Sequence, residues 1–191
     1  MTFRAICVTV GAVMASLCGA ALFVSASTSI DQLGADIDGE AADDRFGVSV
    51  SLSDDGTIVA IGGWKNDAGA TDGGHVQVHQ YSGGAWSQLG DDINGDAATE
   101  QSGWAISLSS DGTIVAIGAP LNEGTPGRVK VYEYSSGAWS QLGSDIDGEA
   151  ADDQFGRSVS LSSDGTTLAI GARYNDGNGD NAGRVQVYQY S

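Results

Sequence analysis

The sequence predicts an all-β protein, an array of three four-stranded antiparallel units. The first observation behind this prediction is internal repetition, because Leu33, Leu89 and Leu142 occupy the same place in three successive copies. The second is a set of short runs in which aliphatic and polar residues alternate, the pattern of a half-buried strand. The third is an Asp-Gly pair between two such runs in every copy, which signals a hairpin turn. The copies cover residues 30–86, 87–139 and 140–191, to within a few residues.

Each copy contains the same four predicted strands. In the first copy, the first strand alternates over Ser49–Ser53 and leads into the Asp55-Gly56 turn. The second strand, Ile58–Ile61, is apolar without interruption, as expected for a strand covered on both faces. The third strand alternates again at Val76–Val78, and the fourth follows a Ser-Gly turn at Ala85–Leu89. The second strand of each unit is therefore expected to be its buried centre.

The repeat length predicts how the units associate. Antiparallel units that recur roughly every 50 residues are typical of β-propeller blades. Gln32–Ile37 is predicted as a separate fourth strand and the sequence stops after a third strand, so twelve predicted strands amount to three blades. Propellers usually have about four to eight blades. We therefore expect a partial propeller, as a piece of a longer one, or half of a six-bladed ring. In the ring, two chains form a homodimer and each N-terminal strand completes the other chain's last blade.

Several short motifs resemble those of a known repeat. Phe46-Gly47 and Phe155-Gly156 precede first strands, Gly118-Ala119-Pro120 closes a second strand, and Gly-x-Val-x-Val-Tyr marks third strands at Gly127–Tyr132 and Gly183–Tyr188. In this order of motifs the chain is similar to the FG-GAP repeat, the blade unit of the integrin α-subunit propeller. The resemblance implies a propeller fold and an extracellular, non-catalytic module that binds through its loops. The pattern is interrupted at three positions: Ser102, Gly63 and Arg173.

The first 26 residues are predicted to be a signal peptide. Arg4 gives a short positive region, Ala5–Val24 carries no charge, and small residues surround position 26. An uncleaved anchor is the alternative, because roughly 20 apolar residues span a bilayer. Cleavage leaves residues 27–191 without Cys7 and Cys18, so no disulfide is expected. We expect the protein to be secreted or displayed at the cell surface.

The mature chain is strongly acidic. It keeps all 25 Asp and Glu residues but loses one of eight Lys and Arg residues, Arg4, so its net charge is 7 − 25, or −18. Nucleic acid is excluded as a partner, because it is bound by neutralising phosphates with Lys and Arg. An anionic membrane surface is disfavoured for the same reason. The expected partner is an extracellular protein or a glycan, with membrane contact only if the signal segment is retained.

The FG-GAP resemblance raises the question of whether the chain binds calcium. In metal-binding blades of that family, the loop between the first two strands carries several aspartates around a Ca²⁺ ion. Here the loop has shrunk to the acids Asp55, Asp111 and Asp164, one in each Asp-Gly turn. One carboxylate and a hydroxyl cannot supply the roughly six to eight oxygens that Ca²⁺ takes. The family's calcium site is therefore not expected in these loops.

A second acidic loop is a better candidate for a cation. Asp145, Asp147 and Asp152, with counterparts in the other copies, gather carboxylates around a glycine turn. Such a group can form an oxygen cage for a hard cation, but Asp and Gly are also typical of a solvated turn. We favour the turn, because the full EF-hand spacing is absent. No cofactor and no metal-binding residue are therefore predicted, and Ca²⁺ at this loop stays the alternative.

No catalytic residue is predicted, and we expect the protein not to be an enzyme. Its two histidines, His75 and His79, lie four residues apart on a strand, which separates their Cα atoms by about 13 Å and prevents them from sharing one metal. Arg or Tyr replaces them in the other copies, which indicates surface positions. The mature chain also has no cysteine, no Gly-x-Ser-x-Gly motif and no phosphate-binding loop.

The tryptophans divide into two kinds. Trp86 and Trp139 recur at equivalent positions, which indicates packing, whereas Trp64 and Trp104 each occur in one copy. Tryptophans near loops can line a sugar or peptide site. The leading hypothesis is a non-catalytic extracellular recognition or adhesion module that binds through the propeller loops. The alternative is a lectin-like polysaccharide-binding module with Trp64 and Trp104 as its anchors.

Overall fold

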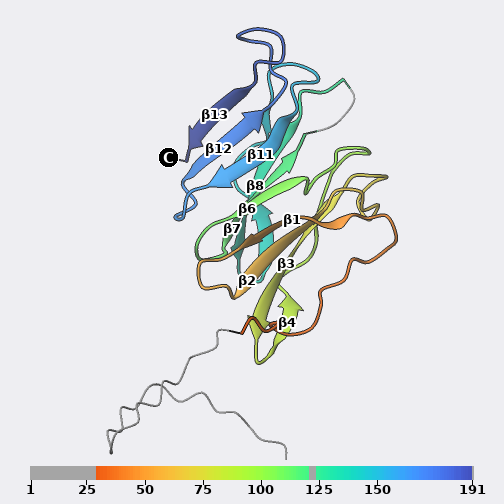
Figure 1. The fold of residues 1–191 in the computed structure, drawn as a ribbon, viewed down its shortest axis with the longest axis vertical. Helices are drawn as coiled ribbons and strands as arrows, with labels where there is room; N and C mark the ends of the chain where they lie inside the picture. Colours follow the sequence, from red (N-terminus) through yellow and green to blue (C-terminus); the bar gives the residue numbers. More distant parts are fainter. Residues whose placement is uncertain (1–28, 121–123, 191) are drawn as a thin grey trace, which may run out of the picture. The chain divides into compact units, whose positions relative to one another are not determined.

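The computed structural model describes residues 29–120 and 124–190, and every helix or strand in these ranges is a β-strand. The chain divides into two compact units, Met1–Asp31 and Gln32–Ser191, and the predicted signal peptide, residues 1–26, lies outside the described residues. The second unit forms three antiparallel sheets, called here the first, second and third blade (Figure 1). The predicted all-β, propeller-like array is confirmed. In the described ranges, no helix is present that could cross a membrane.

The strands follow one another in blade order. The first blade contains β1 (Phe46–Leu52), β2 (Ile58–Gly63), β3 (His75–Ser82), β4 (Ala85–Gln88) and β5 (Ile93–Asn94). The second contains β6 (Ala105–Leu108), β7 (Ile114–Ala119), β8 (Arg128–Ser135), β9 (Ala138–Gln141) and β10 (Ile146–Asp147). The third contains β11 (Phe155–Leu161), β12 (Thr167–Ala172) and β13 (Arg184–Gln189). Both short strands of a blade pair with its third strand, so they form one interrupted outer edge.

Aliphatic side chains between neighbouring blades form the core. The second strands β2, β7 and β12 carry buried apolar residues, as their continuous apolar sequence predicts. Val76 and Val78 of β3 belong to one cluster with Ile106 and Leu108 of β6. The next junction repeats this arrangement, with Val129 and Val131 of β8 packed in a second cluster that includes Phe155, Leu168 and Ile170. Each blade therefore depends on its neighbour to cover its apolar face.

Close contacts between glycines explain the Phe-Gly and Gly-Ala-Pro motifs. A Cβ atom added to Gly62 would lie 2.1 Å from the carbonyl oxygen of Gly103, which itself has a φ of +86°. Gly118 would meet the carbonyl oxygen of Gly156 at the same distance, 2.1 Å. The glycine that opens one blade thus packs directly against the glycine that closes the second strand of the preceding blade. Only residues without a Cβ allow backbones to approach so closely.

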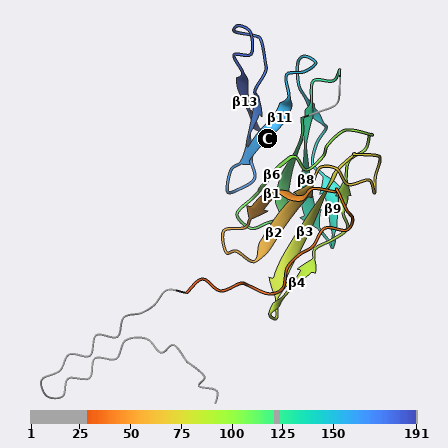
Figure 2. The same cartoon turned by 45° about the vertical axis from the view of Figure 1, so that its right-hand side comes forward.

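The predicted count of twelve strands is wrong because the outer edge strand is split. Gly90 separates β4 from β5 with a φ of +76°, and Gly143 separates β9 from β10 with a φ of +78°. This left-handed backbone conformation interrupts a strand. The described ranges therefore contain thirteen strands. The third blade has three of them, and β13 forms its free edge (Figures 1 and 2).

The predicted strand at Gln32–Ile37 is also wrong, because these residues form no strand. A strand needs hydrogen bonds from a neighbour, and among the described residues no third strand pairs with this segment. Its local contacts nevertheless match those of an outer strand. The indole of Trp86 donates a hydrogen bond to the carbonyl of Leu33 at 2.8 Å, as Trp139 does to Leu89 at 2.8 Å. The segment thus lies against the first blade as the edge of each blade lies against the next.

Candidate functional site

Charged side chains gather where one blade meets the next. On β8 of the second blade, Lys130 is only 4% exposed, and its Nζ lies 2.6 Å from Asp96 and 3.1 Å from Glu100, which lie between β5 and β6. Desolvation acts to lower the pKa of Lys130, but the hydrogen bond to Asp96 and the charge of Glu100 outweigh it, so the pKa is raised. At the equivalent positions, Gln77 and Gln186 donate to the carboxylates of Glu40 and Glu149 at 3.0 and 3.2 Å.

The acidic loop considered for calcium is engaged by an arginine. Arg128 Nη1 lies 2.9 Å from Asp145, and its Nε lies 3.2 Å from Asp147. Asp152 lies in the following turn with a φ of +66° and joins no ion pair among the described residues. A guanidinium therefore neutralises the two carboxylates that a calcium ion would need. The arrangement supports the interpretation of a turn rather than an oxygen cage.

The aspartates of the three Asp-Gly turns accept hydrogen bonds from residues of the same turn. Asp111 accepts hydrogen bonds from the Ser109 hydroxyl at 2.7 Å, the Thr113 amide at 3.0 Å and the Thr113 hydroxyl at 2.8 Å. These bonds, led by that from Ser109, lower the pKa of Asp111 below its ordinary value. Asp55 and Asp164 make the same contacts in the other blades. Their role is to fix the hairpin turn.

Two acids that the sequence pattern assigns to solvated turns are buried. Asp44 accepts a hydrogen bond from the buried side chain of Asn66 at 2.9 Å, and Asp153 accepts one from Asn175 at 2.6 Å. The expectation of solvated acidic loops is wrong here, because a carboxylate with a buried amide partner can leave water. A sequence signal exists in retrospect. In both copies the asparagine follows the aspartate by 22 residues.

The expectation that the histidines lie at the surface is wrong for His75. Its side chain is 0% exposed, and the ring of Phe46 packs edge-on against it with centroids 5.7 Å apart. Residues 75, 77 and 79 of β3 alternate with the core valines, so they lie on the opposite face of the strand. The segment that carries Glu40 covers this face at His75 and Gln77. His79 is half-buried, with Nε2 3.1 Å from the Gln77 side-chain oxygen. Desolvation lowers the pKa of His79, against the opposing charge of Asp92.

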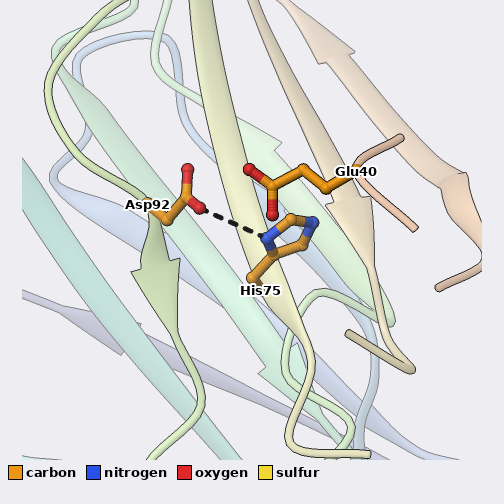
Figure 3. A group of neighbouring side chains, drawn as sticks. All are labelled: Glu40, His75 and Asp92. Atoms are coloured by element: carbon orange, nitrogen blue, oxygen red, sulfur yellow. Dashed lines mark ion pairs between the residues drawn. The ribbon is translucent and has the colours of Figure 1, made fainter. Parts of the chain in front are cut away.

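His75 lies between two carboxylates (Figure 3). Glu40, His75 and Asp92 each offer one ligand atom, and these atoms lie within 4.8 Å of one another. His75 Nδ1 is 3.7 Å from Asp92 Oδ2, and neither ring nitrogen has a hydrogen-bond partner among the described residues. Glu40 precedes the first blade, His75 begins β3, and Asp92 immediately precedes β5. The three residues are called the histidine cluster below.

Trp64 and Trp104 come together across the junction of the first two blades. Trp64 follows β2 and Trp104 precedes β6, and their ring centroids are 5.0 Å apart. The guanidinium of Arg157 on β11 lies 4.0 Å from the Trp104 ring centroid, a cation–π contact that joins the third blade to the pair. Arg173, just after β12, lies 4.1 Å from the ring of Tyr174. These five residues are called the tryptophan face.

The tryptophan face is locally positive on an acidic chain. Among the described residues, no carboxylate lies within ion-pair distance of Arg157 or Arg173. Desolvation lowers the pKa of Arg157, and the positive charge of Arg173 lowers it further. Arg128, Lys130 and Arg184, in contrast, all pair with acids at the blade junctions. Neither guanidinium is neutralised by an acid, although Arg173 donates a hydrogen bond to the Tyr174 hydroxyl, so both can still pair with an anion.

The recurring tryptophans have a different environment. Trp139 packs against the first core cluster, and its ring centroid lies 5.2 Å from that of Tyr134. Trp86 makes the same contact with Tyr81 at 5.2 Å. Each indole also donates a hydrogen bond to a backbone carbonyl, Trp86 to that of Leu33 and Trp139 to that of Leu89. Their role is structural, in keeping with their repetition.

One known repeat family matches part of the chain. Residues 145–188 match the FG-GAP repeat family. This segment is similar to an FG-GAP repeat. The match covers most of the third blade, and the first two copies share its strand order and its glycine contacts. Curated protein sequences gave no match.

Two solved structures share the fold of this chain. One is a candidate 6-phosphogluconolactonase from Bacteroides uniformis, 18% identical, with a TM-score of 0.51 over 74% of this chain and 35% of that one. The other is the periplasmic gluconolactonase PpgL of Pseudomonas aeruginosa, 19% identical, with a TM-score of 0.50 over 74% of this chain and 39% of that one. The chain thus spans less than two fifths of either. At this identity the likeness shows the fold alone.

Proposed function

We propose that this FG-GAP repeat protein is a non-catalytic extracellular recognition module that binds an anionic ligand through the tryptophan face. The observation that carries the proposal is two guanidiniums without a carboxylate partner, Arg157 over the ring of Trp104 and Arg173 over the ring of Tyr174. Trp and Arg are the residue types most enriched where binding energy concentrates. A ligand carboxylate or sulfate can pair with a guanidinium while its apolar part contacts the indoles.

A binding role is also favoured over catalysis. A hollow lined by Glu100, Arg128 and Asp147 has a volume of about 80 Å³, and another beside Asp92 and Trp139 has about 180 Å³. Both are smaller than the roughly 300 Å³ at which small-molecule sites begin. Since two structures of similar fold carry the name of lactonases, glucono-δ-lactone is the substrate to test. We expect hydrolysis at the buffer rate, and any faster hydrolysis by the purified protein would contradict the proposal.

Two classes of anionic ligand fit the tryptophan face. The leading one is an acidic segment of an extracellular protein, in keeping with the FG-GAP repeat and the predicted signal peptide. The alternative is an acidic polysaccharide, which is favoured by the pair Trp64 and Trp104 with centroids 5.0 Å apart, because indole rings stack on sugar rings. A glycan array and a pull-down from the extracellular fraction separate the two classes.

The decisive experiment uses charge-matched variants. Trp104→Ala and Arg157→Gln should each weaken binding of the captured ligand at least tenfold, because both remove a contact at the centre of the face. Arg45→Gln removes the same charge from an exposed arginine that pairs with Asp43 elsewhere in the chain, and it should bind normally. Equal binding by Arg157→Gln and Arg45→Gln would overturn the proposed site.

A further inference from the structure

The three blades use different residues at one junction position. At the first residue of the third strand, Arg128 pairs with Asp145 and Asp147 in the second blade, and Arg184 pairs with Glu149 in the third. The first blade has His75 at this place, between Glu40 and Asp92. The acids of this junction are thus kept, while the fixed positive charge that neutralises them elsewhere is replaced by an imidazole.

The histidine cluster leaves this buried imidazole without a hydrogen bond. A buried polar group without a partner is costly, and most such groups in folded proteins are satisfied. Here both ring nitrogens of a fully buried side chain lack a hydrogen-bond partner among the described residues. The side chain is directed into the acidic pair, with Nδ1 nearest to Asp92 (Figure 3). A cation held in common by the three side chains would give one of these nitrogens, Nδ1, a partner.

The spacing fits co-ligands of one metal ion. The 3.7 Å between His75 Nδ1 and Asp92 Oδ2 is too long for a hydrogen bond. Two ligands of a tetrahedral Zn²⁺ ion, each roughly 2.0–2.1 Å from it, lie about 3.4 Å apart, so a small movement of either side chain is enough. The ligand atoms of all three residues lie within 4.8 Å of one another, so side-chain movements can bring them around one ion.

We propose that Glu40, His75 and Asp92 bind a divalent transition metal, with Zn²⁺ as the best match. A histidine nitrogen with two carboxylate oxygens suits Zn²⁺ and leaves a fourth position for water, whereas Ca²⁺ and Mg²⁺ take oxygen ligands alone. Supporting hydrogen bonds orient both acids. Gln88 donates to the other oxygen of Asp92 at 2.6 Å, and Gln77 donates to Glu40 at 3.0 Å.

The proposed ion joins the stretch before the first blade to that blade. Glu40 belongs to the stretch before the first blade, in which Gln32–Ile37 forms no strand. His75 and Asp92 belong to the third strand and the outer edge of that blade. A metal at the histidine cluster fixes the N-terminal stretch to the first blade, as Arg128 fixes the loop of Asp145 and Asp147 to the second.

The test is zinc titration of the purified protein, prepared without a histidine tag. We expect one Zn²⁺ per chain by calorimetry and a rise in melting temperature that EDTA reverses, since a ligand of the native state stabilises it. Equal concentrations of Ca²⁺ or Mg²⁺ should give no such rise. Absence of zinc binding, or binding matched by Ca²⁺, overturns the proposal.

Two variants assign the site. His75→Arg restores the guanidinium of the other blades, so we expect a folded protein that no longer binds zinc. His79→Gln removes the other histidine and should bind as the natural chain does. Should His75→Arg fold poorly, Glu40→Gln on the exposed loop replaces it, with an expected loss of affinity of about 10-fold or more. Zinc binding that survives His75→Arg, or that is lost with His79→Gln, places the metal elsewhere and overturns the proposal.

Discussion

At the residue scale, the blade junctions depend on single buried charges. Lys130 is held between Asp96 and the buried carboxylate of Glu100. Lys130→Met keeps the side-chain length but removes the nearer of the two cations beside Glu100, because Arg128 remains 3.9 Å away, and breaking a buried pair costs about 3–5 kcal/mol. Lys130→Gln introduces the residue that the other two blades use, Gln77 and Gln186, and should cost clearly less because an amide still donates. Urea unfolding measures both variants, and equal losses would show that the amide donor contributes nothing beyond the charge that both variants remove.

At the scale of the strand, the same leucine position has opposite environments in two copies. Leu108 of β6 is 6% exposed in the first core cluster, whereas Leu52 of β1 is 58% exposed because none of the described strands packs over it. Leu108→Ala should lower the free energy of unfolding by about 2–5 kcal/mol, because it leaves a cavity between blades. Leu52→Ala should cost about 0.5 kcal/mol or less. The comparison is made by urea unfolding at concentrations where light scattering gives the single-chain mass, and similar losses would contradict the packing described.

The strands themselves follow from local sequence to different degrees. The alternating runs and Asp-Gly turns predict the first three strands of each blade, because side-chain period and turn chemistry are local properties. The split of the outer edge at Gly90 and Gly143 was not predicted, since it depends on a left-handed φ that glycine permits but does not require. The segment Gln32–Ile37 has strand-like sequence and forms none, because pairing needs a neighbour.

At the scale of the whole molecule, both ends of the blade array have exposed apolar strands. Val50 and Leu52 on β1 are 65% and 58% exposed, and Val185 and Val187 on β13 are 68% and 66% exposed. At the two internal junctions the equivalent valines, Val76, Val78, Val129 and Val131, are all buried. The two exposed surfaces therefore have the same complementary residues as blades that do pack together. Free strand edges of this kind favour pairing with another chain.

We propose that two chains associate head to tail through these ends. The segment Gln32–Ile37 then becomes the edge strand of the partner's third blade, with Ile37 opposite Val185 as Ile146 lies opposite Val129. Within the chain, the Leu108 amide donates to the Ser51 hydroxyl and the Leu161 amide to the Ser107 hydroxyl, both at 3.0 Å. In the dimer, the Leu52 amide would donate in the same way to the Ser160 hydroxyl of the other chain.

Light scattering should give the mass of two chains for the protein without its signal peptide. Val187→Asp introduces a charge on the docking face and deletion of residues 27–37 removes the exchanged strand, so each should shift the mass toward one chain. Ser144→Asp makes the same change in charge at an exposed position outside the two faces and should leave the dimer intact. A folded, soluble monomer at high protein concentration would falsify the association.

By itself, the sequence determined the threefold repeat, the all-β class, the Asp-Gly turns and the similarity to FG-GAP repeats. The strands and turns follow from side-chain periods and short motifs within each copy, and the repeat follows from comparing the three copies. Only the tertiary structure decided that His75 is buried beside Glu40 and Asp92, that Arg128 neutralises Asp145 and Asp147, and that Arg157 lies over Trp104. These contacts join residues of different blades or distant loops. Burial and charge pairing depend on which blade covers which face, and no local pattern encodes that.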